Sequence, residues 1–251
     1  MFVHGLSSLK QFLIPIRLEL SGLNYKLAIS KYGIINGMVL PVILFANFFI
    51  NSFSTLLIPE YSRLLAGKNF NRMKVICLKI FEFIFVFSIL ICGIFLFFSN
   101  DISYLIYKNI EIGIYFKIFS PLILFMYIDS IIDSMLKGIN CQVGSMIINI
   151  CDLLLTIILI YFIVPIYGLS GYILSIFISE IFNFTFSFLL LKNKLKFKFN
   201  IYLFLIKPIF ILLISFTLTL PFSLPYCLNI ILFISLYILL YFISLKKVTF
   251  F

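Results

Sequence analysis

The longest uncharged run of this chain, from Pro208 to Leu245, limits the possible folds most narrowly. As a single helix its 38 residues would measure about 57 Å, nearly twice the ~30 Å hydrocarbon core of a bilayer. Pro221 and Pro225 lie near its middle, where a turn would divide the run into two crossings. The run therefore predicts two transmembrane helices.

The remainder of the chain has the same apolar character. Of its 251 residues, 63% are hydrophobic and only 11% are charged, and the mean hydropathy is +1.22. A soluble domain of this size cannot cover so much apolar surface, so we expect an all-α, polytopic membrane helix bundle. The net charge of +10 does not indicate nucleic-acid binding, because most Lys and Arg residues fall in gaps between apolar runs.

Apolar runs separated by charged residues predict about eight transmembrane segments. The first is shorter than the ~20 residues that a crossing needs, and we interpret it as the second half of a helix. Pro41 and Pro121 each predict a break in the helical hydrogen bonding of a segment, and Pro165–Gly168 predicts a turn. The predicted segments are residues 2–16, 33–58, 75–98, 112–136, 142–164, 168–191, 201–220 and 226–245.

The connections between these segments differ in charge. Alternate connections carry eleven Lys and Arg residues on one side and three on the other. Basic connections stay in the cytoplasm, so both termini are predicted to lie inside, in a bacterial plasma membrane. Residues 192–200 (KNKLKFKFN) form a basic cytoplasmic connection that is also suited to anionic lipid headgroups. This connection divides a six-helix lobe, 1–191, from an accessory two-helix hairpin, 201–251.

Acidic side chains lie inside several of the predicted segments. Asp129, Asp133 and Lys137 share one face of the fourth segment. Ionisable groups at membrane depth are costly and normally face a cavity or a partner helix. We therefore interpret four acids as cavity-lining or coupling groups: Asp129, Asp133, Asp152 and Glu180.

Other polar side chains also follow helical spacing. The second segment carries Asn47 and Asn51, the fifth carries a polar seam through Asn149, and Lys10 and Arg17 share a face of the first. For the rows of Ser, Thr and Asn, hydrogen-bonded helix packing is the favoured interpretation, and a polar cavity is the alternative.

Two stretches of the chain resemble one family of membrane proteins. Residues 31–67 (KYGIINGMVLPVILF…LLIPEYSRLLAG) are similar to the eighth helix and following loop of the stage V sporulation protein B family. Residues 119–184, which contain YIDSIIDSMLKG, are similar to its tenth to twelfth helices. These are polysaccharide-biosynthesis flippases of the multidrug/oligosaccharidyl-lipid/polysaccharide superfamily, built from two six-helix lobes and commonly two extra helices. The resemblance implies the C-terminal lobe of a MATE-like fourteen-helix fold.

The resemblance also implies a function and its partners. A polyprenyl-diphosphate-linked sugar, such as the peptidoglycan precursor lipid II, would move from the cytoplasmic to the outer leaflet by alternating access, without a cofactor. Membrane lipids and a separately encoded N-terminal lobe are the other implied partners. Lys10 and Arg17 become candidates for the diphosphate, and the three amides join them as candidate substrate-binding residues: Asn47, Asn51 and Asn149.

Three alternatives stay open. The same fold serves cation-coupled multidrug exporters, and a non-functional truncated remnant would use its polar rows only for packing. The pair Asp129 and Asp133 resembles the Mg²⁺–diphosphate sites of intramembrane prenyl or phospho-transferases. Such enzymes need further aspartates, whereas Ser130 and Ile132 stand here, so we predict a transporter rather than an enzyme. The five cysteines form no CxxC motif, and no metal site is predicted.

Overall fold

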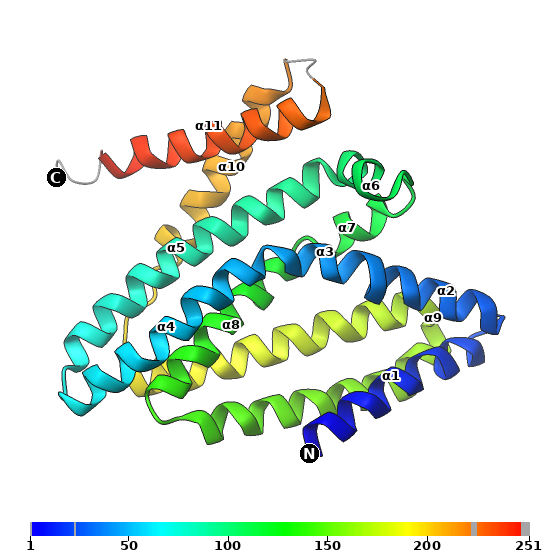
Figure 1. Ribbon diagram of the computed structural model, residues 1–251, viewed down its shortest axis with the longest axis horizontal. Coiled ribbons are helices and arrows are strands. Elements are labelled where there is room, and N and C mark those ends of the chain that lie inside the picture. Colours follow the sequence, from blue (N-terminus) through cyan, green and yellow to red (C-terminus); the bar gives the residue numbers. More distant parts are fainter. Residues whose placement is uncertain (1, 23, 222–224, 247–251) are drawn as a thin grey trace. The chain divides into compact units, whose positions relative to one another are not determined.

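The computed structural model describes residues 2–22, 24–221 and 225–246 (Figure 1). Helices are the only regular elements in these ranges, which confirms the predicted all-α class. The helices group into two compact units. Unit 1 combines Met1–Lys74 with Phe125–Lys196, and unit 2 combines Val75–Leu124 with Phe197–Phe251.

Several helices have the length and apolar character of membrane spans. Within the described residues five helices qualify, or six when the bent pair of α7 (Gly113–Phe119) and α8 (Leu122–Gly138) is taken as one span. These numbers fit a polytopic membrane bundle, and the predicted total of eight stays a prediction. The five are Tyr25–Phe45, Phe70–Phe97, Gln142–Leu195, Tyr202–Thr219 and Tyr226–Ser244.

Unit 1 begins with α1 (Phe2–Leu20), which is followed by a nearly continuous series of helices. The series runs through α2 (Tyr25–Gly33), the π-helical turn η1 (Ile34–Val39), α3 (Leu40–Phe45) and α4 (Asn47–Ala66). The predicted segment 33–58 is therefore displaced, because the helix starts eight residues earlier and is interrupted at Ala46.

Two local features account for this difference. Lys26 and Lys31, which ended the apolar run in the sequence, lie within α2 instead of in a loop. Pro41 is in the first turn of α3, directly after the π turn, where its missing N–H is tolerated. Pro41 thus marks the change from π-helical to α-helical pitch and not the end of the helix.

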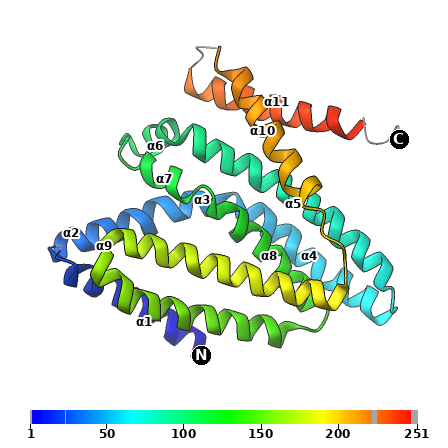
Figure 2. The ribbon, with the colours of Figure 1, turned by 180° about the vertical axis from the view of Figure 1, so that it is seen from behind.

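The longest helix of unit 1, α9 (Gln142–Leu195), has 54 residues. It would measure about 81 Å if straight, far more than a bilayer core. Gly168 divides it, with φ +56° and ψ −132°, a conformation that residues with a Cβ rarely adopt. The chain reverses there into two adjacent arms (Figures 1 and 2). We call residues 142–167 the first arm and 169–195 the second arm, and the predicted turn at Pro165–Gly168 is confirmed.

Helix α8 packs alongside α3 and α4 in unit 1. The Tyr127 hydroxyl donates to the carbonyl oxygen of Ile43 at 2.5 Å, and Ser62 Oγ donates to the carbonyl oxygen of Gly138 at 3.1 Å. These contacts follow the same chain direction in both partners, so the helices run parallel. The predicted break at Pro121 is confirmed, since α7 and α8 meet there at 52°.

Unit 2 contains most of α5 (Phe70–Phe97), followed by α6 (Ser99–Tyr107) and α7, and later η2 (Tyr202–Ile206), α10 (Lys207–Thr219) and α11 (Tyr226–Lys246). Helices α10 and α11 confirm the two helices predicted for the long uncharged run. The core of this unit is largely aromatic. The rings of Phe97 and Phe216 stack with centroids 3.7 Å apart, and Phe233 contacts Phe97 edge-on. The unit border after Lys196 falls within the predicted basic connection, while residues 75–124 belong with the C-terminal helices.

Candidate polar site inside unit 1

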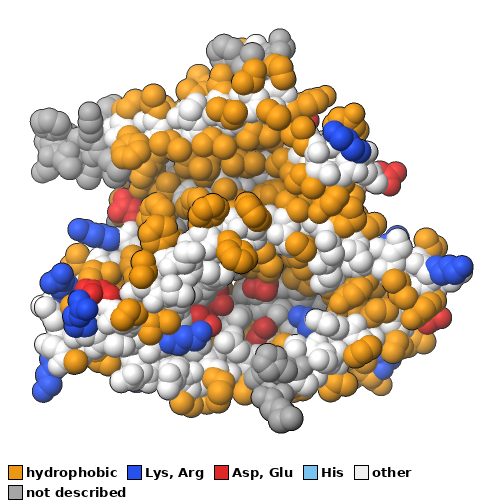
Figure 3. All heavy atoms as spheres, viewed as in Figure 1, with side chains coloured by type: hydrophobic (Ala, Val, Ile, Leu, Met, Phe, Trp, Pro, Cys, Tyr) orange, Lys and Arg blue, Asp and Glu red, His pale blue; other side chains and the backbone are white. Residues whose placement is uncertain are grey.

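Polar side chains of α1, α8 and both arms of α9 gather inside unit 1. The space-filling view shows acidic side chains at the bottom of a hollow in this unit (Figure 3). The helices that supply them are otherwise apolar, so these groups are brought together by packing and not by a polar loop. The hollow is the strongest candidate for a functional site in the described chain.

Asp133 occupies one end of the cluster, on α8. Its Oδ1 accepts a hydrogen bond from Ser145 Oγ at the start of the first arm. Its Oδ2 lies 3.9 Å from Nζ of Lys137, one helical turn further along α8. The predicted pairing of Asp133 with Lys137 is therefore present, and Lys137 itself is exposed. The C-terminal end of α8 therefore carries two oppositely charged side chains in contact.

Asp129 lies one turn deeper on the same face of α8. Its Oδ2 accepts a hydrogen bond from Nδ2 of Asn183 on the second arm, at 3.2 Å. The same Nδ2 atom donates to Oδ1 of Asn149 on the first arm, also at 3.2 Å. The other oxygen, Oδ1, is buried and has no hydrogen-bond partner among the described residues. One amide thus connects three helical segments, and Ser187 of the second arm is a further hydrogen-bond partner of the Asp129 carboxyl group.

Asp152 holds the two arms of α9 together. Its Oδ1 accepts a hydrogen bond from Ser179 Oγ at 2.5 Å, and Ser179 Oγ accepts one from Thr156 Oγ1 at 2.9 Å. Ser179 and Thr156 are buried. Asp152 lies about ten residues, or ~15 Å, from the start of the first arm, which corresponds to the middle of a bilayer core.

Glu180 and Lys10 complete the cluster. Lys10 of α1 lies within electrostatic range of both Asp152 and Glu180. Glu180 in turn lies within range of Asp152 and Asp129. The single ammonium group of Lys10 therefore faces two acids that come from different arms of α9. Within a membrane each such charge costs about 3 kcal/mol or more, so the cluster is expensive to keep for packing alone.

The composition of the cluster limits its chemistry. Four carboxyl groups face two ammonium groups, so the site is net acidic when all are ionised. Amide and hydroxyl groups from Asn149, Asn183 and Ser179 add hydrogen-bonding capacity. Within the described ranges, no three His, Cys, Asp or Glu side chains are arranged to hold a metal ion. The arrangement is suited to binding a polar or charged ligand and to exchanging ion-pair partners.

Three predicted substrate-binding residues lie apart from this cluster. The guanidinium carbon of Arg17 stacks 3.6 Å from the ring centroid of Tyr161 on the first arm. Asn47 donates to Ser130 Oγ at 3.1 Å between α4 and α8. The side chain of Asn51 is exposed on α4. The structure thus brings together Lys10, Asn149 and the four acids, and it uses Arg17 and Asn47 in helix contacts.

A second polar contact was not predicted. Nδ2 of Asn36 in η1 donates to the hydroxyl of Tyr172 on the second arm at 2.6 Å, and the ring of Tyr32 lies beside Tyr172 with centroids 6.0 Å apart. Tyr172 continues the spacing of the row Ser175, Ser179 and Asn183 toward the turn. That spacing was the available signal, and it was missed because tyrosine was counted with the apolar residues.

Comparisons with known proteins add no assignment. No family model, curated protein or solved structure matches the chain.

Proposed function

We propose that this chain is one lobe of a membrane flippase for a polyprenyl-diphosphate-linked saccharide, acting together with an N-terminal lobe. The observation that carries the proposal is the charged cluster in unit 1, where Lys10 lies within electrostatic range of acids from both arms of α9, and these acids lie within range of Asp129 on α8. The resemblance of residues 31–67 and 119–184 to polysaccharide-biosynthesis flippases supports the choice of substrate.

The electrostatic interactions of Lys10 with two acids suggest how cargo binding is coupled to a change of shape. In the described state its ammonium group compensates Asp152 and Glu180. An arriving diphosphate carries more charge and competes for this ammonium group. The acids, once released, require a proton or a cation to stay at membrane depth. Substrate binding is then accompanied by uptake of positive charge, and the contacts between α1 and α9 change with it.

Asn149 and Asn183 contribute in a different way. Their amide groups line the same cluster, and amides both donate and accept hydrogen bonds. Sugar hydroxyl groups would replace the contact between the two amides without leaving a buried polar atom unpaired. These residues therefore bind the saccharide part of the headgroup, while the polyprenyl chain stays in the lipid.

A cation-coupled exporter of the same fold is the second candidate. The excess of carboxyl over ammonium groups in the cluster favours it, because a net acidic site attracts cationic cargo. The two candidates differ in the role of Lys10. A flippase for a diphosphate requires this lysine, whereas a cation-coupled multidrug exporter gains affinity for positively charged drugs when the competing ammonium group is removed.

The test is a flipping assay in proteoliposomes that contain the full chain and a co-expressed N-terminal lobe. A lipid-linked saccharide should become accessible on the outer side, and Lys10→Gln should slow this step by about tenfold or more, the loss expected for one charge-assisted contact. Thr217→Ala is the control, since Thr217 is exposed on α10 in unit 2 and is not a candidate site residue.

Two results would contradict the proposal. One is the absence of flipping by the unmodified chain with its partner lobe. The other is full activity of Lys10→Gln. Faster export of a cationic dye by Lys10→Gln would favour the second candidate instead.

A further inference from the structure

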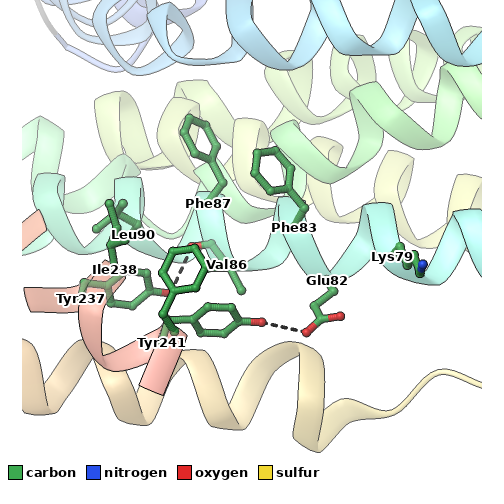
Figure 4. A pocket seen from close by; sticks show the side chains of 10 residues that line it. Lys79, Glu82, Phe83, Val86, Phe87, Leu90, Tyr237, Ile238 and Tyr241 are labelled. Atoms are coloured by element: carbon green, nitrogen blue, oxygen red, sulfur yellow. Dashed lines mark hydrogen bonds between the residues drawn. The ribbon is translucent and has the colours of Figure 1, made fainter. Parts of the chain in front are cut away.

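Unit 2 contains an apolar groove between α5 and α11 (Figure 4). Its volume is about 610 Å³, within the ~300–1,000 Å³ that is usual for small-molecule sites. Phe83, Val86, Phe87 and Leu90 line it from α5. Four residues line it from α11: Tyr237, Ile238, Tyr241 and Phe242. The hydroxyl groups of the two tyrosines in the lining are engaged: Tyr237 donates to the carbonyl oxygen of Val86 at 3.1 Å, and Tyr241 donates to Glu82 at 2.9 Å.

The groove has the length of one bilayer leaflet. Its lining on α5 extends from Lys79 to Leu90, which corresponds to about 16 Å of helix. Half of a ~30 Å hydrocarbon core is about 15 Å. Phe83 and Phe242 are 56% and 63% exposed, which is unfavourable in water and favourable against lipid. An acyl chain entering from one membrane surface would end near Leu90.

One end of the groove is basic. A smaller pocket of about 260 Å³ shares Lys79 and Glu82 with the groove and adds Lys198 and Asn200. Both lysines are exposed. A third lysine, Lys207, has its Nζ buried 5.4 Å from the ring centroid of Tyr241, with no hydrogen-bond partner among the described residues. Three ammonium groups against the single carboxylate of Glu82 give this end an excess of positive charge.

Aromatic contacts hold Lys198 at this end. The extended segment after Lys196 alternates basic and aromatic residues. Phe197 packs on Phe81 of α5 and Phe199 packs on Phe85, with ring centroids 5.6 Å apart in both pairs. Because alternate side chains of an extended segment point in opposite directions, Lys198 is directed outward next to Lys79. The basic end is therefore fixed by packing.

We propose that this groove binds one anionic glycerophospholipid, with an acyl chain along Phe83–Leu90 and the phosphate group between Lys79 and Lys198. An apolar channel of leaflet length that ends in an ammonium pair matches the two parts of such a lipid. A zwitterionic lipid matches less well, because its choline or ethanolamine group would face the excess of lysines. This site belongs to unit 2 and is separate from the polar cluster of unit 1.

The chain contains no tryptophan, so a single introduced tryptophan reports on the groove. Phe83→Trp places the reporter in the lining, and Phe210→Trp places a comparable one on α10, where Phe210 is 65% exposed outside the groove. The full chain is reconstituted in phosphatidylcholine vesicles that contain either brominated phosphatidylglycerol or brominated phosphatidylcholine as quencher. We expect about fivefold or greater preference for phosphatidylglycerol at Phe83→Trp, and no preference at Phe210→Trp.

The lysines are tested in the same reporter. The double variant Lys79→Gln/Lys198→Gln should remove the preference for phosphatidylglycerol. The control is Lys192→Gln/Lys194→Gln, which removes the same charge from exposed positions of the basic connection and should retain the preference. High salt should weaken the preference without any substitution. Equal quenching by both lipids in the Phe83→Trp reporter would overturn the proposal. Quenching by neither lipid would also overturn it, because protein would then cover the groove.

Discussion

The two units of this chain pack by different means. Unit 1 is held by hydrogen bonds that cross between helical segments, such as the one from Ser179 to Asp152. Unit 2 is held by aromatic rings, such as Phe97 on Phe216, around a core of apolar residues. Inside a membrane, apolar contact alone gives little driving force for helix association, because lipid is equally apolar. Each unit therefore needs specific contacts in addition to apolar burial. These are polar side-chain contacts in unit 1 and ring contacts in unit 2.

This difference bears on where the proposed functions lie. The ring contacts of unit 2 involve no charged groups. They leave the groove between α5 and α11 open at the surface of this unit, where a lipid can bind. The charged groups of unit 1 are costly at membrane depth, and a simpler helix bundle would not need them. We therefore place the proposed transport chemistry in unit 1. Substitutions in both units test how far this difference holds.

The largest effect is expected at Gly138, where α8 approaches α4 in unit 1. An added Cβ would lie 2.6 Å from Cβ of Tyr61 and 3.0 Å from the carbonyl oxygen of Ile58, and neither position can move freely. In unit 2, a Cβ on Gly93 would meet only the flexible end of Leu212. Gly138→Ala should destabilise the protein by about 3 kcal/mol, and Gly93→Ala by about 1 kcal/mol. Unfolding in detergent, followed by circular dichroism, measures both, and equal losses would show that the two helix contacts are equally adaptable.

Gly168 is the next most sensitive position. Its φ of +56° and ψ of −132° permit the reversal between the arms of α9. Gly168→Ala should cost about 2 kcal/mol through backbone strain and should loosen the polar contacts between the arms. Gly37→Ala is the matched control, because its Cβ would meet nothing within 4 Å in a helical position. That control should leave the free energy of unfolding unchanged or raise it slightly. A similar loss in both variants, measured by unfolding in detergent, would show that backbone strain at Gly168 is not the cause.

The electrostatic interaction of Lys10 with Asp152 should give a smaller, coupled effect. We expect Lys10→Gln and Asp152→Asn each to destabilise unit 1. Lys10→Gln removes the ammonium group that compensates two acids, and Asp152→Asn removes one of the two acids that compensate Lys10. The double variant should recover about 1 kcal/mol relative to the sum of the single losses. A double-mutant cycle from detergent unfolding measures this coupling. Strict additivity would mean that Lys10 and the acids do not interact.

The smallest effect is expected in the aromatic core of unit 2. Phe97→Leu keeps an apolar side chain and removes the stacking on Phe216, so it should cost about 1 kcal/mol. Phe12→Leu on α1 is the control, because Phe12 is 75% exposed. Thermal shift in detergent compares the two variants. A loss at Phe97 no greater than at Phe12 would show that ring contacts do not hold unit 2 together.

The sequence predicted those features that depend on local chemistry. The uncharged run after Lys207 became α10 and α11, Pro121 marked a bend, and Gly168 marked a reversal. Membrane helices are defined by apolar length, and prolines and glycines act on their own backbone, so these features need no tertiary information.

Other features depend on contacts between distant residues. Residues 75–124 associate with the C-terminal helices because phenylalanines of the two segments fit together, as Phe97 and Phe216 do, and no periodic pattern specifies such a fit. In the candidate site, helical spacing in the sequence identified the acids and Lys10. The same spacing also indicated Arg17 as a site residue, equal to Lys10. Only the structure places the guanidinium group of Arg17 on Tyr161. The contact of Asn36 with Tyr172 was missed for the same reason.

Two neighbouring positions, Cys151 and Asp152, can show whether the polar interior of unit 1 contains water. Cys151 is exposed in the structure, on the surface of the first arm that we assign to lipid, whereas Asp152 is partly buried in the cluster. A charged, membrane-impermeant thiol reagent reacts with thiolates, which form only where water is present. In native membranes, Asp152→Cys in a Cys151→Ser chain should react at least about tenfold faster than native Cys151 does, despite its greater burial. Faster labelling of Cys151, or equal protection of both positions, would contradict a water-filled site.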